Sequence, residues 1–252
     1  MRFVDLETAK ASSGVRLVML KGAPSPWSQA AKAIFQVKGV DVLGVWNVPG
    51  DQALQAWTGV PNAPVVMFEQ EPPRSHWADI LALAERIGPA IALVPRDLDE
   101  RVRAFGLCNE ILGQNGLVWS MRLSLIELSL TSQGARGYST TIAQYLGARY
   151  GYSPGCGALA DARIIDILTA LEAQLQRGGP YYFGSQLSAL DIYSAAAIDT
   201  LSPLSAADCP MHPKTRAAFE SRRDAATFAV PQALLAHRDL MHREHMPLPI
   251  VC

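Results

Sequence analysis

Apolar and polar positions follow different periods in the two parts of this chain. Three short apolar runs in the first third, over residues 15–20, 42–46 and 65–68, predict buried strands. Helical patterns lie between or after these runs, over about residues 28–37, 51–57 and 76–87. The first two strands and the helix between them form a β-α-β unit, so we expect these strands to be parallel with a right-handed crossover.

From Pro95 onward the pattern is almost wholly helical. Pro95 and the Gly-Pro pair that ends in Pro89 break helices, so we place a domain boundary in this stretch. The sequence therefore predicts an α/β domain over residues 1–88, in which 1–13 form an extra N-terminal segment. An all-helical domain is predicted over residues 96–252.

Two features of the helical half mark individual helices. Asp97 and Glu100 have the spacing of a capping box, which predicts that a long helix opens there. A later helix is marked by apolar residues at spacings of four, three and four, which predict one buried stripe: Ile164, Leu168, Leu171 and Leu175.

Composition and charge narrow the class of protein. The chain has 252 residues, of which 49% are hydrophobic and 18% charged, so it can bury a large core. A formal net charge of -1 gives no reason to expect nucleic acid or an anionic membrane as partner, which favours a small-molecule ligand. The start of the chain lacks an apolar signal segment and no run is long enough to span a bilayer, so we expect a soluble cytoplasmic protein.

The four cysteines form no CxxC pair, which excludes a local zinc ribbon or dithiol motif, and we expect them to be reduced. Cys108 lies in a helical pattern and is predicted to be a core residue. Near the C-terminus, His237, His242 and His245 lack the carboxylate or cysteine that would complete a metal site. We therefore predict no metal site and a solvated amphipathic helix around these histidines.

Three local motifs come in an informative order along the chain. Ser25-Pro26 opens a helix, Ala63-Pro64 precedes the third strand, and Ser188 to Asp191 has the form of a capping box inside the helical half. Together they resemble the cytosolic glutathione transferase family. The resemblance implies a thioredoxin-like N-terminal domain followed by an all-helical domain, glutathione as cosubstrate, and a homodimer. Asp191 is then a helix-capping residue with no catalytic part.

Ser25 matches the position at which many serine-type members of this family contact the glutathione sulfur. A free thiol has a pKa near 8.5, so a donated O–H and the positive end of a helix would favour its anion. The alternative is a plain N-cap serine, which is a common role. Neither position 25 nor position 28 is a cysteine, which argues against a thiol-transferase mechanism because that chemistry needs a mixed disulfide.

Ala63-Pro64 is similar to the segment in which the family has a cis-proline. The resemblance implies that the backbone N–H and C=O of Ala63 pair with the cysteinyl part of glutathione. X-Pro bonds are the only ones for which the cis form is accessible at a cost of about 0.5 to 1 kcal/mol. The alternative is a trans proline at the start of an edge strand.

The pocket for the γ-glutamyl group of glutathione is the weakest match. The family usually has an acidic residue followed by a small one at the start of the next helix, where this chain has His76 and Trp77. A shift of two residues would use Arg74 and Ser75, and Ser75 could cap the helix and donate to the γ-glutamyl carboxylate. None of these residues is acidic, so the ammonium group lacks its expected partner.

The resemblance implies a glutathione transferase that holds the thiolate at Ser25 and directs it at an apolar electrophile. Peroxidase, isomerase and thioether-cleaving reactions share the thiolate step and stay as alternatives. A non-catalytic module with the same fold is a further alternative. Side chains that could line a second-substrate pocket, but that are equally typical of a helical core and are not assigned, are Trp119, Met121, Arg122, Tyr145, Tyr150 and Tyr152.

Overall fold

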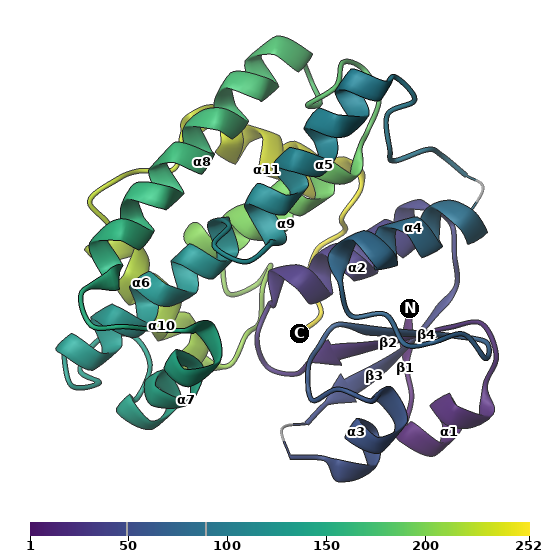
Figure 1. Cartoon of the computed structure of the whole chain (residues 1–252), viewed down its shortest axis with the longest axis horizontal. Helices are drawn as coiled ribbons and strands as arrows, with labels where there is room; N and C mark the ends of the chain where they lie inside the picture. Colours follow the sequence, from purple (N-terminus) through teal and green to yellow (C-terminus); the bar gives the residue numbers. More distant parts are fainter. Residues whose placement is uncertain (49, 89) are drawn as a thin grey trace.

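The computed structural model describes residues 1–48, 50–88 and 90–252. Pro49 and Pro89, which the sequence places in loops, lie outside the described residues. The first third of the chain, which we call the sheet half or thioredoxin-like half, forms a sheet with helices on both faces (Figure 1). Its elements are β1 (Arg2–Phe3), α1 (Leu6–Ala11), β2 (Val15–Leu20), α2 (Pro26–Val37), β3 (Val42–Asn47), α3 (Gln52–Thr58), β4 (Val65–Phe68) and α4 (Trp77–Ile87).

The sheet has the strand order β1-β3-β2-β4. Strand β2 is parallel to β3, which confirms the predicted β-α-β unit, and β4 is antiparallel to β2. The side chains of β2 alternate between the two faces, because Leu17 and Met19 join the main core with α2 while Val18 packs with Leu54 of α3. Helices α2 and α4 therefore cover one face, and α1 and α3 the other (Figure 1).

The N-terminal segment is part of this sheet, which the sequence did not reveal. Strand β1 pairs in parallel with β3, and Phe3 stacks on Trp46 with ring centroids 3.8 Å apart. Gly44 permits this contact, because a Cβ atom there would lie 2.7 Å from the Phe3 ring. Asp5 then caps α1 by accepting the backbone N–H of Thr8 at 2.8 Å.

The second half is helical. Its elements are α5 (Leu98–Leu112), α6 (Leu117–Thr131), α7 (Thr140–Tyr150), α8 (Cys156–Gly178), α9 (Ala189–Leu201), α10 (Pro213–Ala225) and α11 (Gln232–Glu244). The predicted stripe of α8, from Ile164 to Leu175, is buried. Asp97 caps α5 through the N–H of Glu100, as expected. Within the described residues, no helix is long and apolar enough to cross a membrane.

Helix α9 is the centre of the helical half, and all of its residues are buried. The predicted capping box at its start is confirmed. The Asp191 carboxylate accepts the backbone N–H of Ser188 at 2.8 Å and that of Tyr182 at 3.0 Å, and it lies 2.8 Å from His237 Nε2. Asp191 therefore fixes the start of α9 to the preceding loop and to α11.

The prediction of a solvated terminal helix is wrong for two of its histidines. His237 and His242 are buried, because α11 packs on α9 and each imidazole contacts a buried carboxylate. His242 Nε2 lies 2.9 Å from Asp199. The sequence showed no partner for these histidines because the two carboxylates are more than forty residues away.

Helix α2 also packs against α9, so it joins the two halves (Figure 1). Trp27 Nε1 in its first turn donates to the carbonyl of Leu112 at 2.8 Å. Nearby, the N–H of His212 donates to the carbonyl of Gly22 at 3.1 Å, just before α2. These bonds hold the N-terminus of α2 in a fixed position relative to the helical half.

Candidate functional site

Ser25 is the N-cap residue of α2 and Pro26 follows at the first helical position. Its backbone is held on both sides, since Ser25 N–H donates to Ala23 at 2.8 Å and its carbonyl accepts from Gln29 at 2.9 Å. Its side chain makes no capping hydrogen bond. Ser25 thus has the position of a helix cap without the bond that defines a cap, and its hydroxyl is available for another partner.

The Ala63–Pro64 peptide bond is cis, as predicted. Ala63 is partly exposed, and among the described residues its backbone N–H and C=O have no backbone hydrogen-bond partner. Ala63 and Ser25 line the same cavity, although they lie 38 positions apart in the sequence. The structure therefore brings together two of the positions that the sequence predicts to contact glutathione.

This cavity, which we name the Ser25 cavity, has a volume of about 650 Å³ and lies between the two halves of the chain. The sheet half contributes Ser25, Trp27, Asn47, Asn62 and Ala63 among others. The helical half contributes residues from α6, the loop before α7, α7 and α10, including Arg122, Tyr138, Tyr145, Arg149, Tyr150 and Lys214. A small molecule in the cavity would thus contact both halves.

The start of α4 differs from the expectation in one respect. The N-cap of α4 is His76, whose Nδ1 accepts the N–H of Ala78 at 3.3 Å, so the predicted capping role of Ser75 is wrong. Ser75 and His76 are exposed, whereas Trp77 is buried and packs on Tyr193 with ring centroids 5.7 Å apart. The predicted contacts of Ser75, His76 and Trp77 with glutathione stay predictions.

A narrow gap of about 10 Å³ separates the start of α4 from the proline of the cis bond. Ser75, Trp77 and Pro64 line it. A volume near one probe sphere is too small for any part of a tripeptide, so a γ-glutamyl group would have to lie over the exposed side of Ser75 and His76.

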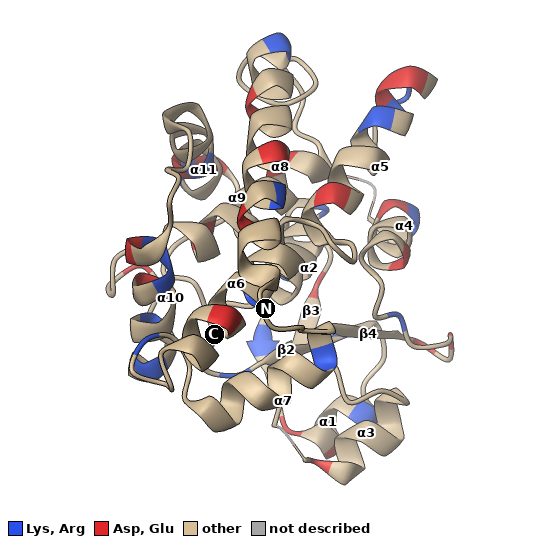
Figure 2. Cartoon of the chain, turned by 60° about the vertical axis from the view of Figure 1, so that its left-hand side comes forward, with Lys and Arg blue, Asp and Glu red and all other residues tan. Residues whose placement is uncertain are grey.

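Cationic side chains of the Ser25 cavity are functional candidates that the sequence analysis did not assign. Arg122, Arg149 and Lys214 line it, together with His212, and no described lining residue is Asp or Glu. Figure 2 shows Lys and Arg along α10, the helix that carries Lys214. Arg122 and the tyrosines Tyr145 and Tyr150 were considered for a second-substrate pocket, and the structure places them in the cavity.

Arg122 is buried with 7% of its surface exposed. Its Nη1 donates to the Tyr138 hydroxyl, and its guanidinium lies 5.4 Å from the centroid of the Phe219 ring. Burial raises the pKa of Tyr138 although the neighbouring Arg122 acts to lower it, so this phenol stays neutral at neutral pH. The charge of Arg122 is therefore in contact with neutral groups.

None of the four cysteines lines the Ser25 cavity. Cys108 is buried in the core, as predicted, and burial raises the pKa of its thiol well above the ordinary value. Ser28, one turn into α2, is fully buried and is not a cavity residue. Two serines, Ser25 and Ser139, line the cavity. The Ser139 hydroxyl caps α7 by accepting the N–H of Ile142, whereas that of Ser25 makes no capping bond.

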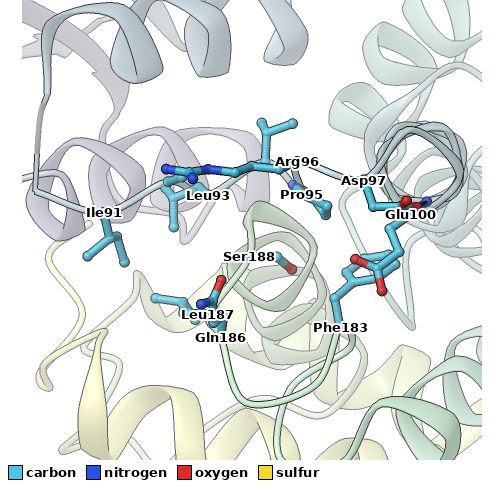
Figure 3. A pocket seen from close by; sticks show the side chains of 12 residues that line it. Ile91, Leu93, Pro95, Arg96, Asp97, Glu100, Phe183, Gln186, Leu187 and Ser188 are labelled. Carbon is cyan, nitrogen blue, oxygen red and sulfur yellow. Dashed lines mark hydrogen bonds between the residues drawn. The ribbon is translucent and has the colours of Figure 1, made fainter.

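A second cavity of about 630 Å³ lies elsewhere, between the inter-domain linker and the loop before α9 (Figure 3). Leu93 and Pro95 of the linker face Leu187 and Ser188 across it. It contains none of the residues predicted to contact glutathione. The Ser25 cavity is therefore the candidate site.

Solved structures resemble the chain along nearly its whole length. A rice GST in complex with glutathione matches with a TM-score of 0.61 and 18% identity over 94% of this chain and 93% of that chain. The chain has the glutathione transferase fold. Glutathione transferase Omega 3C from Trametes versicolor gives a TM-score of 0.59 at 16% identity, covering 95% of this chain and 85% of that one.

A bacterial structure is also similar to this chain. The enzyme from Methylobacterium radiotolerans, in complex with glutathione sulfonate, has a TM-score of 0.58 and 17% identity, over 95% of this chain and 98% of that chain. Neither a protein-family model nor a curated protein matches this chain. At identities this low, the structural similarity shows the fold alone. That fold is a thioredoxin-like half followed by a helical half, as predicted.

Proposed function

We propose that the protein is a glutathione transferase that takes glutathione as cosubstrate on its thioredoxin-like half. The backbone of Ala63 pairs with the cysteinyl part of the tripeptide, and the Ser25 hydroxyl donates to the sulfur. The observation that carries this proposal is that two groups line one cavity at the start of α2: the Ser25 hydroxyl, which makes no capping bond, and the backbone of Ala63, which has no backbone hydrogen-bond partner among the described residues.

The chemical task of the site is to hold a thiolate at neutral pH. Lowering a thiol pKa of 8.5 by about 1.5 to 2 units requires about 2 to 3 kcal/mol of preference for the anion. A donated O–H to an anion supplies about 1.5 to 3 kcal/mol, and the N-terminus of α2 adds to it. The sulfur, once anionic, attacks an electrophile held on the helical half.

Ser75, His76 and Trp77 complete the proposed glutathione contacts at the start of α4, where the helix N-terminus favours the γ-glutamyl carboxylate. The absence of an acidic side chain at positions 75–77 favours the second candidate, a non-catalytic module that uses the fold without the thiolate chemistry. Peroxidase, isomerase and thioether-cleaving activities belong to the first candidate, because each begins with the same thiolate.

Binding of glutathione by isothermal titration calorimetry separates the two candidates. The transferase proposal expects saturable binding at millimolar or lower concentration, and no binding would sink it. With glutathione bound, the ultraviolet absorbance of the thiolate against pH gives the pKa of the thiol. Ser25→Ala should raise that pKa by about 1 unit or more, since it removes a hydrogen bond to a charged group. An unchanged titration would leave Ser25 as a helix cap only.

A further inference from the structure

The helical side of the Ser25 cavity carries three cationic side chains. Arg122 from α6, Arg149 from α7 and Lys214 from α10 all line it. Among the described residues, none of these three cations lies within 4 Å of a carboxylate. Their charges therefore add in the cavity with nothing there to neutralise them.

Among these three cations, Arg122 gives the strongest evidence for an anion site, because a buried charge is costly unless it is paired. Its contacts are the hydroxyls of Tyr138 and Tyr150 and the ring of Phe219. Tyr138 cannot supply the missing negative charge, since burial keeps its pKa above the ordinary value. Arg122 is nine-tenths buried, lines the cavity and has no carboxylate partner among the described residues, so an anion in the cavity would supply its counter-charge.

Helix ends add to this field. The N-cap residues of α2, α7 and α10, which are Ser25, Ser139 and His212, all line the cavity. Each N-terminus presents unpaired N–H groups and a partial positive charge. His212 uses Nδ1 to accept the N–H of Lys214 at 3.2 Å, which leaves its Nε2 free to donate.

Apolar and aromatic side chains also line the helical side. Ile142, Tyr145, Leu146 and Tyr150 line it, and Trp27 faces it from α2. These side chains suit a flat apolar molecule, while the cations suit one ionised group on it. The α6, α7 and α10 cations lie on the helical half, whereas Ser25 and Ala63 belong to the thioredoxin-like half.

We propose that the second substrate of this protein is an aromatic or unsaturated electrophile that carries a carboxylate, and that Arg122 binds the carboxylate, supported by Lys214. The reactive part of the proposal rests on the proposed transferase function. In the simplest such reaction the thiolate attacks a ring carbon that bears chlorine. The C–S bond forms, chloride leaves with the C–Cl electron pair, and the thiol proton has gone to solvent.

Two electrophilic substrates that differ only in the carboxylate group test the predicted preference for a negatively charged second substrate. One is a dinitrobenzoate with chlorine para to the carboxylate and between the two nitro groups, and the other is its methyl ester. We expect kcat/KM, divided by the uncatalysed rate constant of each acceptor, to favour the acid by about 10- to 100-fold, as for a hydrogen bond to a charged group. Equal values, or a preference for the ester, would overturn the proposal.

Substitution of Arg122 tests whether this residue causes the preference for the acid over the ester. Arg122→Gln should lose most of the acid-over-ester ratio, whereas Arg136→Gln should retain it. Arg136 is an exposed arginine in the loop before α7 that does not line the cavity, so it controls for the change in net charge. If Arg122→Gln does not fold, Lys214→Gln, at an exposed position, should still lower the ratio about threefold or more, the effect of a modest ion pair. An unchanged ratio in every folded cavity variant contradicts the proposal.

Calorimetry with unreactive ligands separates this inference from the proposed function. The chlorine-free dinitrobenzoate should bind the protein without glutathione, and its methyl ester should bind more weakly by about tenfold or more. If the dinitrobenzoate binds but glutathione does not, the anion site stands and the transferase proposal fails. If Arg122→Gln weakens glutathione binding and leaves dinitrobenzoate binding unchanged, Arg122 serves the tripeptide and the inference is wrong.

Discussion

Ser25 and Arg122 line the same cavity from the two parts of the chain, the serine at the start of α2 and the arginine on α6. Ser25 was predictable, because Pro26 and the apolar period that follows mark a helix start wherever the helix packs. Arg122 was not assignable, because it stands in a strongly apolar helix and only the packing of α6 decides whether a cation there meets a carboxylate or a cavity. The start of α4 shows the same limit, since either Ser75 or His76 can cap a helix and the backbone selects His76.

Ser25→Cys tests the position of Ser25 independently of any second substrate. A thiol introduced at this helix N-terminus should have a pKa below 8.5, by the same effect that favours a bound thiolate. Incubation with glutathione disulfide should then give a mixed disulfide at position 25, detected by peptide mass spectrometry. Wild-type protein is the control for the four native cysteines. If the introduced thiol stays unmodified while a native cysteine reacts, this result would argue against a glutathione site there.

Secondary-structure elements were largely predictable where their signals are local. The strands at 15–20 and 65–68 agree with the structure to the residue, and the helix ends differ by one or two residues. The N-terminal segment was missed because β1 has only two residues, and a strand that short has no period. The burial of the α11 histidines was not predicted, because their partners Asp191 and Asp199 lie on another helix, α9.

Asp191 makes α9 the most sensitive element to substitution. Asp191→Ala should lower the free energy of unfolding by about 3 to 5 kcal/mol, since it leaves several buried donors without an acceptor. Chemical denaturation followed by circular dichroism measures this loss. Asp99→Ala, an exposed first-turn position of α5, is the matched control and should cost about 0.5 kcal/mol or less. A small effect at Asp191 would mean that water or a neighbour replaces its carboxylate.

The contact of α11 with α9 should depend on pH. Burial acts against charge on His242, but its hydrogen bond to Asp199 raises the pKa of the imidazole above the ordinary value. Burial also raises the pKa of Asp199. The pair of protonated His242 and ionised Asp199 therefore stabilises the fold at pH values above the raised pKa of Asp199 and below the pKa of an unfolded histidine, and this contribution is lost as pH rises through the raised pKa of His242. Denaturation of wild type and His242→Gln at a series of pH values should show a difference that shrinks toward alkaline pH. A difference that is constant or grows with pH would contradict the assignment.

At the scale of the whole molecule, the order of a thioredoxin-like half and a helical half followed from the sequence. The Ser25 cavity did not, because its shape and charge depend on how α6, α7 and α10 face the start of α2, and no local pattern encodes that arrangement. Local sequence patterns account for the helices and strands, whereas the cavity is formed by residues from segments that are distant in the sequence.

A homodimer is the assembly that we propose for this molecule. Leu98 and Val102 lie one turn apart on α5 with 70% and 65% of their surfaces exposed, which favours burial against a second copy. Sedimentation equilibrium should give twice the chain mass of 27.2 kDa. The double variant Leu98→Glu/Val102→Glu should be monomeric, whereas Leu159→Glu, at another exposed apolar position, should not. A monomeric wild type at micromolar concentration would refute the dimer.

The stacking of Phe3 on Trp46 has a practical consequence for anyone who shortens the gene. Removing residues 1–13 would remove the edge strand β1 and expose the backbone of β3 and the face of the Trp46 ring to solvent. Open strand edges pair with other chains, so such a truncated protein should precipitate or form soluble aggregates although the residues of the Ser25 cavity are retained. We therefore expect residues 1–13 to protect the edge of the sheet from intermolecular pairing.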